Sequence, residues 1–173
     1  MKKLGLTLVF ILIANFTFAQ SIFDKFEDND EVTTVVINQK LFKMLGSIGE
    51  EVDGEEAKDL VDIANNIKEL KIFTTDNASV GEKMVSTMQK YIKSENLSEL
   101  MRVKDKGQLV KVYVREGNSE NFVKELVMYV KNTDGQNVLM SLTGNIDLRK
   151  IGRIADKVKG AEALKSIKVK TAK

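Results

Sequence analysis

The fold is decided by residues 99–143, ELMRVKDKGQLVKVYVREGNSENFVKELVMYVKNTDGQNVLMSLT, in which apolar and polar side chains alternate. Four segments here have the period of two that is typical of β-strands with one packed face. They are residues 99–105, 108–116, 121–132 and 137–145. Lys-Gly, Gly-Asn and Thr-Asp-Gly-Gln connections join them, which is the residue chemistry of hairpin turns. The stretch therefore predicts a four-strand antiparallel meander.

The residues before the meander predict helices with two strands among them. We expect a buried strand at 32–37, where β-branched residues are frequent, and a second strand at 69–76. Helices are expected at 21–30, 40–49, 53–67 and 79–95, and a last helix at 144–158 follows the meander. The first should place Ile22, Phe23 and Phe26 on one side. Together these elements predict an α+β fold of two layers, with a mainly antiparallel sheet and helices packed on one face.

Three of these helices carry specific expectations. In 53–67 the apolar stripe facing the core is Ala57, Leu60, Val61, Ala64 and Ile67. In 79–95, Ser79 and Glu82 fit a capping box, and the methionine-bearing stripe is expected to belong to the core. In 144–158, Asp147 is the expected N-cap, and the inward stripe is Leu148, Ile151, Ile154, Ala155 and Val158.

The first residues of the chain indicate export. Lys2 and Lys3 precede the uncharged apolar run 4–14, and Thr17 and Ala19 occupy the −3 and −1 positions of a cleavage site. This layout predicts a secretory signal peptide, residues 1–19, removed to leave a chain from Gln20. The run is about half as long as the ~20 residues of a membrane span. We therefore expect a soluble periplasmic or extracellular protein without a transmembrane anchor, with one domain at 20–160 and a frayed basic tail at 161–173.

The composition removes several classes of chemistry. The chain contains no cysteine and no histidine. Thiol nucleophiles, Ser-His-Asp triads and ordinary zinc or copper sites need those residues. The acidic clusters 28–31 and 50–56 lack the spacing of an EF-hand and are interpreted as a turn and a solvated helix start. We expect no catalytic residue, no metal site and no cofactor, and we do not expect the chain to be an enzyme.

The charge is divided unevenly along the mature chain. Residues 20–148 contain 16 basic and 23 acidic residues, a net charge of −7, whereas residues 149–173 contain 9 basic and 2 acidic residues, a net charge of +7. Arg149, Lys150, Arg153 and Lys157 form the best candidate binding surface, for an anionic surface component or lipid head group. Solvated lysines that dock on the acidic body explain the same pattern. Nucleic acid is not expected as a partner, because no stacking aromatics interleave the basic residues.

The strands, their order and the leader together resemble a known family. The stretches 35–45, 69–76, 99–117 and 123–148 carry the likeness. They are similar to the exported bacterial family called domain of unknown function 4252, found mainly in Gram-negative envelopes. The resemblance implies an envelope location and an α+β domain over roughly residues 24–158. It implies no activity, and it carries over no catalytic residue.

Three functions remain as hypotheses at this point. The first is a non-enzymatic envelope protein that binds a partner protein or surface component. The second is a hydrolase of envelope glycans that uses a carboxylate pair, for which Glu125 in the apolar run VKELVMYV is the most unusual carboxylate. An envelope stress or regulatory factor is a third possibility that the residues do not address.

Overall fold

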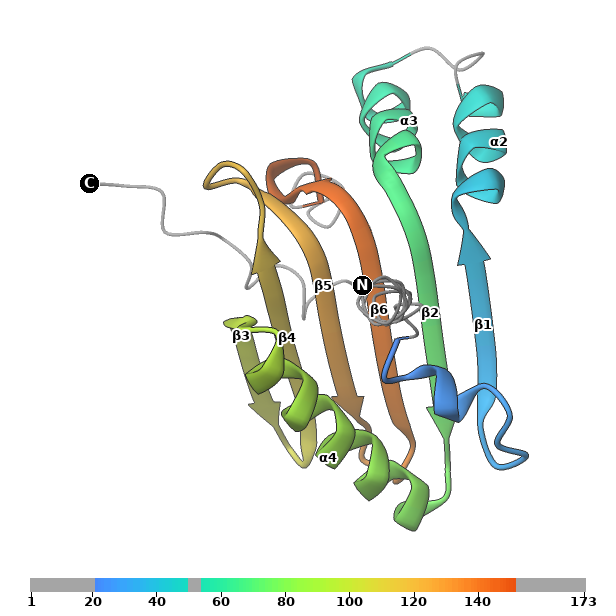
Figure 1. Ribbon diagram of the computed structural model, residues 1–173, viewed down its shortest axis with the longest axis vertical. Helices are drawn as coiled ribbons and strands as arrows, with labels where there is room; N and C mark the ends of the chain where they lie inside the picture. Colours follow the sequence, from blue (N-terminus) through green and yellow to red (C-terminus); the bar gives the residue numbers. More distant parts are fainter. Residues whose placement is uncertain (1–20, 50–53, 152–173) are drawn as a thin grey trace, which may run out of the picture.

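A six-stranded antiparallel sheet forms the centre of the computed structural model, which describes residues 21–49 and 54–151 (Figure 1). The elements in chain order are η1 (Asp24–Phe26), β1 (Thr33–Asn38), α2 (Gln39–Gly49), α3 (Glu55–Asn66), β2 (Ile67–Thr75), α4 (Ala78–Ser94), β3 (Ser98–Asp105), β4 (Gln108–Glu116), β5 (Phe122–Lys131) and β6 (Asn137–Asp147). The α+β class, the antiparallel sheet and the four-strand meander are confirmed.

The strand order is β1-β2-β6-β5-β4-β3. Strands β3 to β6 pair with their neighbours in sequence, as hairpins do, and β1 pairs with β2 across the α2–α3 connection. The pairing of β2 with β6 joins these two units, with Phe73 opposite Leu139. At its end, Gly144 lies so close to the backbone of Asn66 that a Cβ atom would overlap its carbonyl oxygen. This close approach explains a glycine within a strand.

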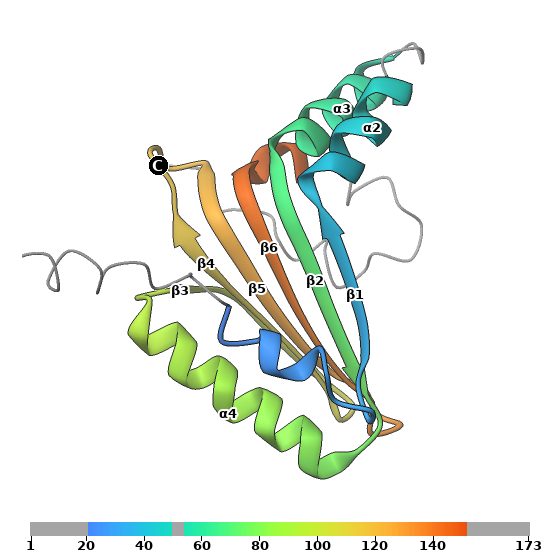
Figure 2. The same cartoon turned by 45° about the vertical axis from the view of Figure 1, so that its right-hand side comes forward.

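Helix α4 crosses one face of the sheet, and the short η1 segment lies beside it on the same face (Figure 2). Between helix and sheet lies the main core, in which Met84 and Met88 are completely buried. Its other large members are Phe23, Phe26, Phe73, Val127, Tyr129 and Leu139. The methionine stripe of α4 therefore belongs to the core, as its spacing predicted.

The N-cap of α4 differs from the sequence prediction. Asn77 caps the helix, because its side-chain oxygen accepts a hydrogen bond from Val80 N at 3.1 Å. Ser79 therefore lies inside the first turn, and the predicted Ser79–Glu82 capping box is wrong. Asn77 also donates through Nδ2 to Glu31, in the segment before β1, at 2.5 Å. This second contact holds the asparagine at the position where it can cap.

A largely buried lysine links η1 to the sheet through ion pairs. Lys71 of β2 reaches Asp24 Oδ1 at 2.5 Å and Glu27 Oε1 at 2.8 Å. Burial alone would lower the pKa of Lys71, but hydrogen bonds to these two carboxylates raise it above its usual value. The segment forms a single 3-10 turn, and Phe23 and Phe26 enter the core while Ile22 remains 37% exposed. The prediction that a helix over 21–30 places all three side chains on one side is wrong, because only the two phenylalanines enter the core.

Helices α2 and α3 form a hairpin that extends past the ends of β1 and β2 (Figures 1 and 2). Phe42 of α2 and Ile63 of α3 pack against a second cluster that includes Leu142 and Leu148. Since side chains alternate along β6, Leu142 faces away from α4. The predicted inward position of Leu60 is wrong, because this side chain is 54% exposed.

The first strand also differs from its prediction. Residues 32–37 were expected to be buried, but β1 is an edge strand with an exposed Val35 and Val36. An edge strand has a neighbour on one side only, so its β-branched composition does not ensure burial.

At the other end of the described chain, Asp147 accepts a hydrogen bond from Arg149 N at 3.0 Å, as an N-cap does, and residues 148–151 begin a helical turn. Ile154, Ala155 and Val158 lie outside the described residues.

Candidate functional site

The carboxylate that the sequence singles out, Glu125, lies on β5 beneath α4, where its side chain is 6% exposed. The hydroxyl of Tyr91 on α4 lies 2.9 Å from both carboxylate oxygens. Ser141 Oγ of β6 lies 3.4 Å from Oε1. Glu125 therefore faces the covered side of the sheet and is surrounded by hydrogen-bond donors.

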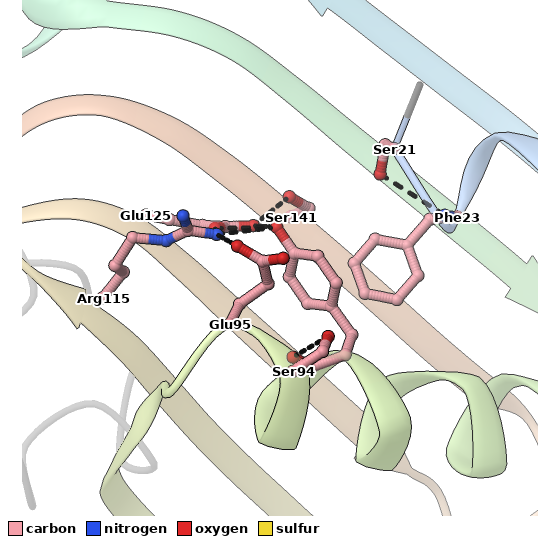
Figure 3. A network of polar contacts seen from close by, with 8 residues as sticks. Ser21, Phe23, Ser94, Glu95, Arg115, Glu125 and Ser141 are labelled. Atoms are coloured by element: carbon pink, nitrogen blue, oxygen red, sulfur yellow. Dashed lines mark hydrogen bonds and ion pairs between the residues drawn. The ribbon is translucent and has the colours of Figure 1, made fainter. Parts of the chain in front are cut away.

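An arginine neutralises this carboxylate and links it to a second one. Arg115 of β4 lies opposite Glu125 in the strand register, and its Nη2 reaches Glu125 Oε2 at 2.9 Å. The same nitrogen lies 3.0 Å from Oε2 of Glu95, which follows the last residue of α4. Figure 3 shows Arg115 between the two carboxylates. The network joins the C-terminal end of α4 to three strands.

The pKa shifts of Tyr91 and Arg115 are those expected when both groups stabilise a buried carboxylate. Burial, and then the negative charge of Glu125, raise the pKa of Tyr91 well above its usual range. Burial alone would lower the pKa of Arg115, but the charge of Glu125 raises it. The phenol stays protonated and the guanidinium stays charged at neutral pH. Both groups therefore remain donors to the carboxylate.

Two cavities in the described part of the chain bear on whether a substrate could reach this network. One cavity of about 570 Å³ lies at the β4–β5 turn, with Leu100, Val114 and Leu148 among its lining residues. Another of about 420 Å³ lies between α4 and the strands, beside Lys111 and Lys131. None of the network residues lines either cavity. A general acid must be within reach of its substrate, so the geometry does not favour hydrolysis by Glu125.

The structure places two of the four predicted surface-binding residues, and both form ion pairs. Arg149 donates to both oxygens of Asp147, from Nε at 3.0 Å and from Nη2 at 2.7 Å. Lys150 instead turns to α3, where its Nζ lies 2.5 Å from Asp62 and 3.9 Å from Asp59. The two side chains bind different partners. Arg153 and Lys157 lie outside the described residues, and the binding role of the four stays a prediction.

Two further results concern metal ions and membranes. Within residues 21–49 and 54–151, no three acidic, histidine or cysteine side chains are grouped as a metal site. In the exposed acidic cluster at 28–31, Glu31 N donates to Asn29 Oδ1, as in a tight turn. Among the described helices, none has the length and apolar character needed to cross a membrane.

The main surface feature that the sequence reasoning missed is a concentration of exposed apolar side chains. Seven large hydrophobic side chains of the described chain are between 37% and 54% exposed, and six of them lie in β1, α2 and α3. We call these six the β1–α2–α3 apolar region. They are Val35, Val36, Leu41, Met44, Leu45 and Leu60. The signal available in the sequence was the uncharged strand 33–38 next to a helix with apolar residues at 41, 44 and 45.

The comparisons with known proteins give one family match. The model of a family described as "Domain of unknown function (DUF4252)" matches residues 26–154, which is most of the chain and includes every described strand and helix except the start of η1. No curated protein and no solved structure matches the chain.

Proposed function

Because the chain belongs to the domain of unknown function 4252 family, and this membership assigns no activity, we propose that the protein is an exported, non-enzymatic envelope protein that serves as a binding module. Its contact surface is the β1–α2–α3 apolar region. Export rests on the signal-peptide pattern of residues 1–19, which predicts a mature chain that begins at Gln20 in the periplasm or outside the cell.

The distribution of exposed apolar residues carries this proposal. Single exposed apolar side chains are normal on any protein, but a gathering of large ones marks a surface that another molecule covers. Met44 and Leu60 are each more than half exposed, although both belong to helices whose other faces are packed. The partner that fits is a protein or envelope component that offers an apolar surface. The enclosed Glu125 network supports a non-enzymatic role, because its donors are directed at the carboxylate.

The test is capture of binding partners from an envelope extract by the purified mature chain. A Leu60→Lys variant should lose captured partners, because it places a charge in the apolar region at a half-exposed site that tolerates it structurally. A Thr133→Lys variant is the matched control, since Thr133 is exposed on the β5–β6 turn. Equal capture by the wild type and Leu60→Lys would contradict the assigned surface. The mass of the protein isolated from cell fractions tests export, because the leader must be absent from it.

A further inference from the structure

The two edge strands of the sheet differ in how they are protected. The sequence of β3, SELMRVKD, contains four charged residues, and its pairing with β4 shifts register between Glu99 and Met101. Charges and bulges of this kind keep an edge strand from pairing with other chains. The sequence of β1, TTVVIN, contains no charge and no proline, and its register with β2 is regular. The outer edge of β1 therefore has backbone N–H and C=O groups that pair with no described strand. Neither charged side chains nor a bulge protects this edge.

We propose that β1 pairs with β1 of a second copy of the chain, in the antiparallel direction, so that the two sheets become one. The inference rests on the proposed function, because β1 belongs to the apolar region, but it adds the backbone as the contacting group. Closed two-fold dimers are the commonest assembly of identical chains. A two-fold axis normal to the sheet places a residue opposite its own copy, and at mid-strand this residue is Val35 or Val36.

The charges at the two ends of β1 favour a second copy over a different partner. Before the strand, Asp28 and Asp30 are exposed, and after it Lys40 and Lys43 are exposed on a helix without acidic residues. None of these four side chains forms an ion pair with another described residue. Antiparallel pairing brings the start of each β1 beside the end of the other. The aspartates of each copy therefore meet the lysines of its partner, whereas parallel pairing would bring like charges together.

The exposed side chains next to β1 extend the contact beyond the strand. A six-residue strand is about 20 Å long, and a stable interface buries about 800 Å² on each partner. The backbone edge alone is too narrow for this area, so side chains must contribute. Val35 points away from α4 and Val36 toward it. With Val36 opposite its own copy, Val36 meets Val36 on one face and Val35 meets Ile37 of the second copy on the other, so each face of the joined sheet gains an apolar pair. Leu41 and Met44 of α2, both exposed, lie just past the strand end and beside the partner's acidic segment.

The first experiment measures the mass of the purified mature chain by sedimentation equilibrium. We expect a concentration-dependent dimer, and we expect Val36→Lys to raise its dissociation constant at least tenfold, because a lysine on the edge acts as natural edge protection does. Leu60→Lys is the control for a charge in the apolar region outside the strand, and it should leave the dimer unchanged. Circular dichroism verifies that both variants fold. A wild type that stays monomeric up to about 100 µM would overturn the proposal.

The second experiment tests the antiparallel arrangement by charge reversal. Two double variants reverse the charges at one end of β1 each: Lys40→Glu/Lys43→Glu and Asp28→Lys/Asp30→Lys. Each should weaken its own homodimer, because both contacts between the segment before β1 and helix α2 of the second copy become repulsive. Mixed in equal amounts, the two variants should form a heterodimer, since one contact has both charges reversed and the other is wild type at both sides. Native mass spectrometry distinguishes the species. Homodimers of undiminished stability, or a mixture without heterodimer, would rule out this interface.

The outcomes separate this inference from the proposed function. If the chain is a monomer that still captures an envelope partner through Leu60, the proposed function holds and the dimer is refuted. A strand of a different protein would then be the remaining candidate to pair with β1. A dimer that captures nothing supports the inference and counts against the binding module.

Discussion

Replacing Arg115 with methionine should destabilise the fold by removing the counter-charge of a buried carboxylate. Breaking a fully buried ion pair in this way costs about 3–5 kcal/mol. Two features of the network reduce this value. The Arg115 side chain is 34% exposed, and Glu125 keeps the hydroxyl of Tyr91 as a hydrogen-bond donor. We therefore expect the free energy of unfolding to fall by about 2–3 kcal/mol, since a hydrogen bond to a charged group contributes about 1.5–3 kcal/mol.

Urea unfolding at neutral pH measures this loss, provided that the slope of the transition is unchanged. Glu125→Gln alone should cost less, because Arg115 keeps Glu95 at 3.0 Å and the amide oxygen still accepts from Tyr91. The double variant should recover part of the loss, because no uncompensated charge remains under α4. The double-mutant cycle then gives a coupling energy of about 1–2 kcal/mol.

The matched control is Arg102→Met on the neighbouring strand. Arg102 also forms a carboxylate pair, with Glu99, but its side chain is 56% exposed. Pairs at the surface contribute little because water and salt screen them. If Arg115→Met were no more destabilising than Arg102→Met, or if the cycle were additive, the assignment of the network as a structural clamp between α4 and the sheet would be wrong.

Three further predictions concern the stability of the folded chain, measured by urea unfolding. Met84→Ala should cost about 2–5 kcal/mol because it empties a completely buried position, whereas Met44→Ala, at a 53% exposed position, should leave stability nearly unchanged. Gly144→Ala should cost more than about 3 kcal/mol or prevent folding, because its methyl group would overlap the Asn66 carbonyl. A hydrogen bond from the arginine two residues later lowers the pKa of Asp147 below its usual value. Its stabilising effect should therefore be present above pH ~4, the usual pKa of an aspartate, and be lost as the pH falls through the lowered pKa, so the stability difference between Asp147→Asn and the wild type should be larger at pH 6 than at pH 3 and should shrink steadily with further acidification.

The parts of the fold that the sequence predicted are those set by local patterns. The meander was located because period-two alternation and turn residues act between neighbours in the chain. Apolar periodicity also identified the buried stripe of α4. It failed at Leu60, because a helical pattern shows that one face is apolar but not whether another element covers all of it. In the same way, the composition of 32–37 predicted a strand, whereas its position at the sheet edge depends on the strand order.

The candidate site was predicted only in part for the same reason. Glu125 was recognisable as a carboxylate within an apolar run, but its partners come from distant segments. Arg115 becomes its neighbour through the β4–β5 register, and Tyr91 through the path of α4 across the sheet. The cap at Asn77 was missed because a contact with Glu31, 46 positions earlier, decides between candidate capping residues. These contacts are set by tertiary structure.

The pairing of β2 with β6 has a consequence for how the molecule folds. Every other strand pair of the described sheet forms between segments joined by a hairpin or by the α2–α3 connection, so each unit can assemble early and independently. The seam between them requires residues more than 60 positions apart to meet, and such long-range closure is slow because of its entropy. We expect the amides that bond across the seam between β2 and β6 to gain protection from hydrogen exchange last during refolding, after the β5–β6 pairing that completes the meander.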